Sequence, residues 1–380
     1  MNFHFNQDEQ DVLDMLHDFC LKEVAPIAAE IDETERFPEE TWHKLADMGM
    51  MGIAYPEEVG GAGMSYVTYI GACEELAKHC ATTSVMVSAH SSLCCWPISE
   101  YGTEAQKEKY LSKLCSGEWL GAFGLTEPGA GTDAAMQKTV AEDKGDHWVL
   151  NGSKIFITNA GFANVFVVFA MTDKSLGTKG ISAFIVERDF PGFKVGSHEK
   201  KMGIRGSSTC ELVFEDCIVP KENLLGEVGK GFKIAMTTLD GGRIGIGAQA
   251  LGIAQAAIDE CVKYTKERVQ FGKRISQFQN TQFQLADMQA KLDGARLLIY
   301  RAAQAKQDHE PYSHLAAMGK LMASEVASDV TRRALQLVGG YGYTREYPFE
   351  RFMRDAKITE IYEGTSEVQR MVISGALGVK

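Results

Sequence analysis

The hydrophobic pattern of this chain changes its period twice, and no other feature constrains the fold as strongly. From Asn6 to about Cys115 apolar residues recur at helical spacing, whereas between Trp119 and Pro220 the period is two. After Gly231 the helical spacing returns. Helices, then strands, then helices predict an α+β protein with a small β domain between two helical domains.

The domain boundaries are placed where the period changes. A chain of 380 residues exceeds the roughly 250 to 300 at which a single core stops growing, so several domains are expected. We predict an N-terminal helical domain over 1–117, a middle β-barrel-like or β-sandwich domain over 118–230, and a C-terminal four-helix-bundle domain over 231–380. The stretch IGIGAQALGIAQAAI in the last domain is rich in Gly and Ala, which favours close approach of neighbouring helices.

Local signals predict individual elements. Asn6 and Glu9 have the spacing of a capping box at the start of the first helix. Asn151-Gly152, between two β-rich runs, predicts a hairpin turn. The later helices are expected at about 39–48, 67–80, 103–115, 231–267, 280–306 and 312–338, with a last one from near Thr365.

The charge and the cysteines narrow the function classes. With 39 Lys and Arg against 51 Asp and Glu, the net charge of -12 opposes binding to nucleic acid or to an anionic membrane. No apolar run approaches about 18 residues, so no membrane insertion is expected. The nine cysteines show no CxxC spacing, and the start MNFHFNQDEQ resembles neither a signal nor a transit peptide. We therefore expect reduced thiols and a cytoplasmic protein.

Three motifs suggest ligand sites, but their contexts do not support them. GAGTDA, residues 129–134, matches the dinucleotide pattern G-x-G-x-x-A, yet Pro128 precedes it and no βαβ unit surrounds it. GEVGKGF, residues 226–232, lacks the spacing of a phosphate loop. The nine histidines show no paired ligand spacing, so we expect no metal site.

The stretch YEGTSEVQR, residues 362–370, places Glu363 and Gly364 directly before a predicted helix. A buried lone carboxylate suits abstraction of a proton next to a carbonyl, because burial raises its pKa from about 4.3 toward neutrality. Backbone N–H groups at a helix start can bind the developing enolate oxygen. Spacing alone favours the simpler interpretation that Glu363 complements a helix dipole, and leaves both open.

Six segments, in the same order along the chain, resemble the acyl-CoA dehydrogenase family of flavoproteins. They are GAFGLTEPGAGTDA, NGSKIFITNAG, LDGGRIGIGAQALGIAQAA, ERVQFGKRISQFQ, ALQLVGGYGYTREYP and IYEGTSEVQR with the preceding RFMRDAKITE. The resemblance covers essentially the whole chain and is closest in look to the short-chain, butyryl-CoA-type members. It implies the family's fold and FAD as the cofactor.

The resemblance also implies a reaction. Glu363 would remove the pro-R α-proton of an acyl-CoA thioester while hydride passes from the β-carbon to flavin N5, which gives a trans-2-enoyl-CoA. The thioester oxygen would lie between the Glu363 N–H and a flavin ribityl hydroxyl, where a side chain at Gly364 would crowd it. Isovaleryl and long-chain members carry the catalytic glutamate at position 242, and Gly242 here leaves Glu363 as the base.

Many residues match the family's binding positions. The resemblance assigns to FAD Phe123, Leu125, Thr126, Gly131, Thr132, Phe156, Ile157, Thr158, Arg268, Phe271, Gln279, Gln336, Leu337, Val338, Gly339, Gly340, Thr365 and Glu367. It assigns to the substrate Thr132, Asp240, Arg243 and Gly364. Thr158 would meet flavin N5 and Thr126 the pyrimidine end. Phe156 stands where many members carry tryptophan, a change that keeps stacking, and Thr132 stands where serine is common.

The resemblance further implies shared cofactor sites. Arg268, Phe271, Gln279 and residues 336–340 match positions that reach the FAD of a neighbouring subunit, so a homotetramer, a dimer of dimers, is expected. Arginine suits a pyrophosphate because its guanidinium donates two parallel hydrogen bonds. The expected electron acceptor is electron-transferring flavoprotein.

Rival functions predict different sequences. An acyl-CoA oxidase shares the chemistry but is usually a much longer chain, and a nitroalkane oxidase would have aspartate in place of Glu363. A catalytically silent flavin-fold scaffold should have lost the base or the FAD contacts, and this chain keeps both.

The acyl group is the least determined part of the substrate. Bulky Trp96, Pro97 and Tyr101, within residues 87–102, predict a high pocket floor, although they fit an ordinary core equally well. We expect butyryl-CoA as the substrate, with branched isobutyryl- or 2-methylbutyryl-CoA as the alternative.

Overall fold

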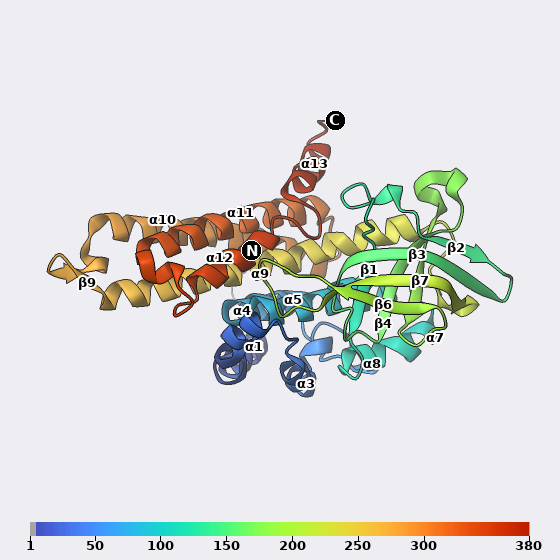
Figure 1. The fold of residues 1–380 in the computed structure, drawn as a ribbon, viewed down its shortest axis with the longest axis horizontal. Helices are drawn as coiled ribbons and strands as arrows, with labels where there is room; N and C mark the ends of the chain where they lie inside the picture. The colour runs from blue at the N-terminus through green and yellow to red at the C-terminus, as the bar shows by residue number, and fades with distance from the viewer. Residues whose placement is uncertain (1–4, 380) are drawn as a thin grey trace.

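The computed structural model describes residues 5–379, and Figure 1 shows the sheet at one end of a long molecule with the helical bundle extending to the other. The N-terminal helices lie along one side. The predicted α+β class, with helical, β and helical parts in that order, is confirmed. Within residues 5–379 no helix combines the length and the apolar composition that a bilayer crossing requires.

Between Gln7 and Cys115 the regular structure is helical. Its first helix is capped as predicted: the Asn6 side chain accepts the Glu9 N–H at 3.0 Å, and the Asn6 N–H donates to the Glu9 carboxylate at 2.9 Å. The α-helices of this part are α1 (Gln7–Phe19), α2 (Ala28–Thr34), α3 (Glu39–Asp47), α4 (Tyr66–His79), α5 (Ala81–Ala89), α6 (Trp96–Tyr101), α7 (Glu104–Gln106) and α8 (Ser112–Cys115).

Residues 81–101 form one continuous helix, made of α5, the π-helical segment η5 (His90–Cys95) and α6. All nine residues of α5 are buried, so no polar face marks a helical period and the hydrophobic pattern does not predict this helix. The segment η5 packs on the first strand of the sheet, since a Cβ on Gly121 would contact the Cys94 side chain.

The middle part holds an eight-stranded sheet with the order β6-β7-β3-β2-β4-β5-β8, and β1 pairs in parallel with β4. A single residue pair, Val140 with Met171, joins β2 to β4, so the two halves of the sheet meet at one narrow join. The strands are β1 (Gly121–Gly124), β2 (Val140–Asp143), β3 (His147–Thr158), β4 (Val165–Met171), β5 (Ile181–Glu187), β6 (Phe193–His198), β7 (Thr209–Pro220) and β8 (Leu224–Leu225).

The hairpin predicted at Asn151-Gly152 is wrong, because β3 runs straight through these residues. The turn lies upstream, where the Lys144 N–H donates to the His147 carbonyl at 2.9 Å. Gly152 has φ +144°, and the pairing of β3 with β7 shifts just before it. The Asn-Gly pair therefore marks a β-bulge, at which Asn151 and Asp216 exchange hydrogen bonds of 3.0 and 2.8 Å.

The C-terminal part is built on three long helices that lie side by side, with α12 packed against two of them. Glycines of α9 allow this closeness: a Cβ on Gly247 would contact Ile299 of α10, and one on Gly252 would contact the backbone of α4 at Glu74. The helix α13 projects from the body in Figure 1. The elements are α9 (Gly231–Glu267), β9 (Val269–Gln270), β10 (Lys273–Arg274), α10 (Gln279–Gln307), α11 (Ser313–Val338), α12 (Phe349–Ile358) and α13 (Ser366–Ala376).

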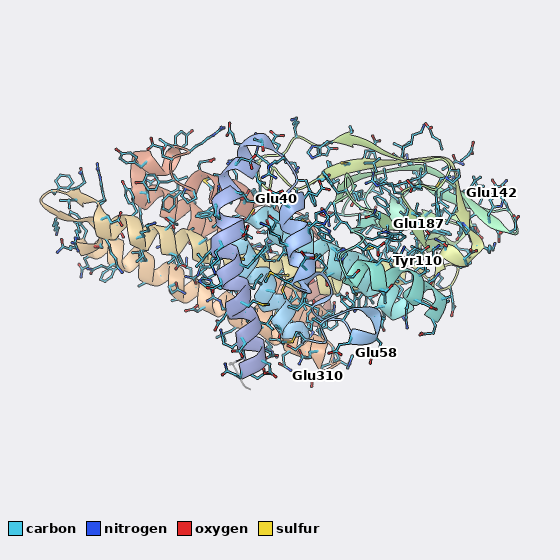
Figure 2. The ribbon with its side chains drawn as sticks, turned by 90° about the horizontal axis from the view of Figure 1, so that it is seen from below. Glu40, Glu58, Tyr110, Glu142, Glu187 and Glu310 are labelled. Atoms are coloured by element: carbon cyan, nitrogen blue, oxygen red, sulfur yellow. The ribbon has the colours of Figure 1, made fainter. Side chains whose placement is uncertain are left out.

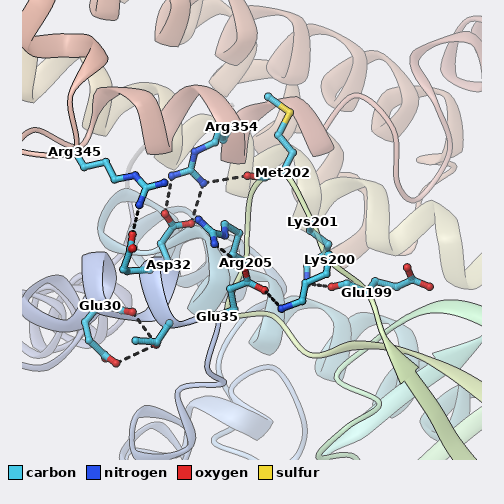
Figure 3. A network of polar contacts seen from close by, with 12 residues as sticks. Glu30, Asp32, Glu35, Glu199, Lys200, Lys201, Met202, Arg205, Arg345 and Arg354 are labelled. Atoms are coloured by element: carbon cyan, nitrogen blue, oxygen red, sulfur yellow. Dashed lines mark hydrogen bonds and ion pairs between the residues drawn. The ribbon is translucent and has the colours of Figure 1, made fainter.

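Figure 3 shows a network of ion pairs where the three parts of the chain meet. Arg354 of α12 donates to both carboxylate oxygens of Asp32 in α2, at 2.9 and 2.6 Å, and to the Met202 carbonyl at 3.0 Å. Arg205, in the same loop between β6 and β7, donates to Glu35 at 2.6 Å. Asp32 is buried and the other three side chains are half-buried, so the pairs are less screened by solvent than fully exposed pairs, and they link the three parts.

A second polar junction joins the N-terminal helices to the sheet around Tyr110 and Glu187, both labelled in Figure 2. The Tyr110 hydroxyl donates to Glu187 at 2.7 Å, and Lys109 pairs with the same carboxylate at 2.7 Å. Asn223 donates to the Tyr110 oxygen at 2.8 Å. This junction holds the end of β5 against the helices that precede the sheet.

Candidate active site

Glu363 lies in the turn that leads into α13. Its φ of +52° is a left-handed conformation that is strained for a residue with a Cβ, and Gly364 follows with φ +97°. Thr365 then caps α13, accepting the Val368 N–H. A Cβ on Gly364 would lie 2.8 Å from Gln369 Nε2. Position 364 therefore requires glycine for its own backbone and for its packing on α13, before any substrate is considered.

Two side chains hold this turn in place. Lys320 Nζ, from α11, and Gln369 Nε2, from α13, each donate to the Gly364 carbonyl at 2.7 Å. Lys320 is fully buried, and burial lowers the pKa of its ammonium to about 8. The motifs do not reveal Lys320. The available signal is a lysine at a position where α11 otherwise buries small residues such as Ala316 and Ala323.

Glu363 is half-buried, and one oxygen of its carboxylate is inside the protein. Its Oε2 is buried and has no hydrogen-bond partner among residues 5–379. Gly242 of α9 faces it: a Cβ there would contact Oε2 and would lie 2.9 Å from Leu93 Cδ2. Burial raises the pKa of Glu363 to about 8, and the nearby cations of Lys320 and Arg243 offset part of that rise. An unpartnered carboxylate that titrates near neutrality is suited to accept a proton.

Asp240 and Arg243 lie one turn apart on α9 and form an ion pair. Arg243 is 4% exposed, and its Nε has no hydrogen-bond partner in the described part of the chain. Burial raises the pKa of Asp240, and Arg243 opposes that rise. The structure thus brings Arg243 near Glu363, while the substrate contacts of both residues stay predictions.

The flavin contacts predicted in the middle domain lie on β1, β3 and the loop after β1. Phe156 is presented at a bulge of β3, with φ +59° and 59% of its surface exposed. Gly131 and Thr132 are exposed, and a Cβ on Gly131 would meet nothing within 4 Å. A strained, exposed aromatic residue beside an open glycine loop fits a flat ring system with attached phosphates, as in FAD. The other members are either half-buried, as are Phe123, Thr126 and Thr158, or buried, as are Leu125 and Ile157.

A buried ion pair fixes the loop that carries these contacts. Lys154 Nζ lies 2.7 Å from Glu127 Oε1 and also donates to the Leu125 carbonyl at 3.2 Å and to Gln137 at 3.1 Å. Glu127 in turn accepts the Thr139 N–H at 3.0 Å. Sequence reasoning missed this pair. Its signal is a lysine at an inward-facing position of an alternating strand.

The segment η5 connects the flavin side to the base side. Leu93 approaches Gly242 and the Glu363 carboxylate, whereas its neighbour Cys94 packs on Gly121 of β1. One short helical segment therefore contacts both β1, the strand that carries Phe123, and the surroundings of Glu363.

The second group of predicted FAD contacts lies elsewhere in the chain. Arg268 directly follows α9, and Phe271 lies in the tip between β9 and β10. Figure 1 places β9 at the opposite end of the molecule from the sheet. Phe271 is 95% exposed, and Arg268 lies over the Tyr341 ring at 5.5 Å. Within one chain this group does not meet Phe156. Of its other members, Leu337 is half-buried, Val338 is buried, and the exposed ones are Gln279, Gln336, Gly339 and Gly340. Thr365 and Glu367, also predicted to contact FAD, lie beside Glu363 at the start of α13.

Trp96, Pro97 and Tyr101, the residues predicted to form the floor of the acyl pocket, lie on α6, directly after η5, and their role as a floor stays a prediction. Leu93 is the member of this helix that faces Glu363 across Gly242. Lys306 Nζ lies over the Trp96 ring, 4.7 Å from its centre, and the Tyr101 hydroxyl is hydrogen-bonded to the Thr237 hydroxyl at 2.8 Å. Burial lowers the pKa of Lys306 to about 7, and its Nζ has no hydrogen-bond partner within residues 5–379.

Three family models match the chain in order. They are described as the acyl-CoA dehydrogenase N-terminal domain, over residues 6–118, the middle domain, over 122–217, and the C-terminal domain, over 229–378.

Known proteins resemble the chain over nearly its full length. A short-chain specific acyl-CoA dehydrogenase of Clostridium acetobutylicum is 59% identical, covering 99% of this chain and 100% of the relative. The structure of butyryl-CoA dehydrogenase from Megasphaera elsdenii is 54% identical, with a TM-score of 0.98 over 99% of this chain and 100% of that one. A chain in a structure of the electron transferring flavoprotein of Acidaminococcus fermentans is 55% identical, with a TM-score of 0.98 over 99% of each chain.

Proposed function

This chain belongs to the acyl-CoA dehydrogenase family, and from that premise we propose that it oxidises a short-chain acyl-CoA, preferably butyryl-CoA, to the trans-2-enoyl-CoA. The observation that carries the proposal is the buried Glu363 Oε2, which has no partner within residues 5–379 and faces a glycine. The short-chain specific relative and the butyryl-CoA dehydrogenase structure support the choice of substrate.

Glu363 performs the proton transfer in this proposal. The cations of Lys320 and Arg243 favour the ionised carboxylate, while burial favours the neutral acid, so the two forms are close in free energy. An α-proton of the thioester moves to Oε2, and the neutral acid that results is the form its buried surroundings prefer. Lys320 and Gln369 hold the Gly364 carbonyl and so fix the direction of the carboxylate.

Bound FAD supplies the acceptor for the hydride that leaves the β-carbon. Phe123, Thr126, Phe156 and Thr158 would hold its ring system: they lie on β1, β3 and the loop after β1, and each keeps part of its surface exposed. The buried pair of Glu127 and Lys154 would keep the glycine loop in position whether or not the ligand is bound.

We also propose the assembly and the electron acceptor. The exposed Phe271 and Arg268 support a homotetramer with shared FAD sites, because they lie far from the predicted flavin contacts in the sheet of their own chain. The similarity to a chain in the electron transferring flavoprotein structure supports that protein as the acceptor. The nine cysteines are all free and buried, which supports the cytoplasmic location expected from the sequence.

The test is to mix purified holoenzyme anaerobically with butyryl-, hexanoyl-, octanoyl-, dodecanoyl-, isobutyryl- and isovaleryl-CoA and to follow the loss of flavin absorbance. Butyryl-CoA should bleach the flavin fastest, because each further CH₂, worth roughly 0.8 kcal/mol where it can be buried, must find space beyond the pocket floor. A maximum at octanoyl-CoA or with a branched thioester would contradict the substrate and leave the family unchanged.

Two rival functions give different results in the same assay. A silent flavin-fold scaffold would show no bleaching with any thioester. An acyl-CoA oxidase would bleach, and in air would form peroxide in amounts equal to the enoyl-CoA, whereas the dehydrogenase should turn over with an artificial acceptor much faster than with O₂.

A further inference from the structure

A second cluster of ionisable side chains lies between α1 and α4, away from Glu363. It consists of His17 on α1 and of Glu75 and His79 on α4. The Nδ1 of His17 lies 2.6 Å from Glu75 Oε1, and the Nε2 of His79 lies 2.8 Å from the same oxygen. All three ligand atoms lie within 4.8 Å of one another, and within residues 5–379 this is the one group of at least three such side chains that close together.

The fold positions this trio on two helices that are firmly packed. Glu75 and His79 are four residues apart, so they share one face of α4. The helix α1 reaches that face through Leu13, which would lie 3.1 Å from a Cβ on Gly71. His17 is 58 residues from Glu75 in the chain, which is why the local spacing of the histidines predicts no metal site.

The donor atoms are those of a transition-metal site. Two imidazole nitrogens and one carboxylate oxygen are a common set of three protein ligands for Zn²⁺, with water in the fourth position. A tetrahedral ion with bonds of about 2.0–2.1 Å needs donor atoms roughly 3.3 Å apart, which small side-chain rotations can supply here. His79 and Glu75 are only 10% and 20% exposed, while His17 is 44% exposed and leaves a path for an ion.

The site can also be reached from solvent. His17 and Glu75 line the rim of a hollow of about 1080 Å³ between α1, α4 and α10, which gives solvent access to the site.

We propose that His17, Glu75 and His79 bind one divalent transition-metal ion of the zinc class, which ties α1 to α4. The helix α9 passes both regions: its Gly252 lies beside Glu74, the neighbour of Glu75, and its Gly242 faces Glu363. These two glycines are ten residues apart, which is about 15 Å along a helix. The ion therefore has a structural role and leaves the Glu363 chemistry untouched.

The experiment is a titration of chelator-treated holoenzyme with ZnCl₂ by calorimetry, for the wild type and for His17→Ala, His79→Ala and Glu75→Gln. The chain contains a matched control: Glu39 and His43 on α3 have the same spacing, are 4.0 Å apart and have no second histidine in reach among the described residues. The wild type and His43→Ala should bind one Zn²⁺ per chain with equal affinity, and each of the three trio variants should bind at least tenfold more weakly.

A second measurement separates a built site from chance binding. Added Co²⁺ should give the visible absorption of a tetrahedral ion in the wild type and in His43→Ala, but not in His79→Ala. Flavin absorbance and turnover with butyryl-CoA show whether each variant is folded. Equal Zn²⁺ affinity in all the folded variants, or wild-type affinity in Glu75→Gln, would reduce the trio to a hydrogen-bonded cluster and overturn the proposal.

Discussion

The turn that carries Glu363 and the β9–β10 tip that carries Phe271 are both strained and both predicted to serve the reaction, yet their surroundings are opposite. Glu363 has φ +52° and is enclosed by Lys320, Gly242 and Leu93 of its own chain. Phe271 has φ +51° and is 95% exposed. The protein neighbours of the base come from its own chain, whereas the tip presents an exposed aromatic ring and an exposed arginine. Proton transfer and cofactor retention should therefore be separable by mutation.

Backbone strain is present at three of the predicted site residues. Phe156, Phe271 and Glu363 are three of the eight non-glycine residues with positive φ among residues 5–379. Two of them expose an aromatic ring, and the third buries a carboxylate oxygen without a partner in the described chain. Conformations of this kind persist only where the surrounding structure or a ligand compensates, and they gather at functional sites.

The largest effect is expected from Glu363→Gln. The amide has the same shape but cannot accept a proton, so turnover with butyryl-CoA should fall at least 100-fold. FAD content after gel filtration should stay at the wild-type level, because the tip is unchanged. Glu325→Gln, at an exposed carboxylate on α11, is the control and should be fully active. A variant that keeps more than about a hundredth of the rate would point to another base.

A smaller loss is expected from Gly242→Ala. The new Cβ would contact Glu363 Oε2 and push the carboxylate aside, and a displacement of about 1 Å can cost up to 100-fold in rate, so we expect a loss of tenfold or more in kcat. Gly294→Ala is the matched control, since a Cβ at that helical position would meet nothing within 4 Å. Equal rates in Gly242→Ala and Gly294→Ala would show that the Glu363 carboxylate is not closely packed against α9.

Arg268→Ala tests whether the β9–β10 tip holds the cofactor. Loss of charge-assisted hydrogen bonds to a pyrophosphate, worth about 1.5–3 kcal/mol each, should weaken FAD retention tenfold or more. The rate at saturating FAD should be unchanged, and Lys266→Ala, at a nearby exposed cation, should retain FAD normally. FAD per chain after gel filtration is the measurement.

Hybrids of two variants decide whether Arg268 acts on a neighbouring subunit. When Arg268→Ala and Glu363→Gln chains are co-assembled, a mixed pair contains one site with both an intact Glu363 and an intact Arg268. Random pairing should therefore restore about a quarter of the wild-type sites at limiting FAD. Activity no greater than the sum of the separate variants would place Arg268 and Glu363 in the same site of one chain.

The smallest effect is expected from Lys320→Met. The Lys320 cation favours the ionised carboxylate, so its removal should raise the pKa of Glu363 further above its usual range. The base form then requires a higher pH: the pH–rate profile should move upward by about one unit, with a several-fold loss at pH 7 that is recovered at higher pH. Lys291→Met, at an exposed lysine on α10, is the control. A loss that is equal at every pH would mean that Lys320 only holds the Gly364 carbonyl.

The sequence predicts the order of the domains and most helices because their periods are visible. It fails at α5, which is buried on every side, and at Asn151-Gly152, where the same two residues that favour a turn form a bulge. For the site, the motifs identify Glu363 as the base and also the exposed loops that carry the predicted FAD contacts. The motifs do not reveal Lys320 or the Glu127–Lys154 pair, because only the packing of segments distant in the sequence brings these charges to the site.

The ion pairs between Arg354 and Asp32 also bear on how the protein is made. The two residues are 322 positions apart, and synthesis proceeds at roughly 5–20 residues per second. On the ribosome, α2 must therefore wait about 15 to 60 seconds before the helix that neutralises Asp32 emerges. The junction of the three parts is closed only when the chain is almost finished, so a nascent chain that stalls before α12 would expose this unmatched surface to protein quality control.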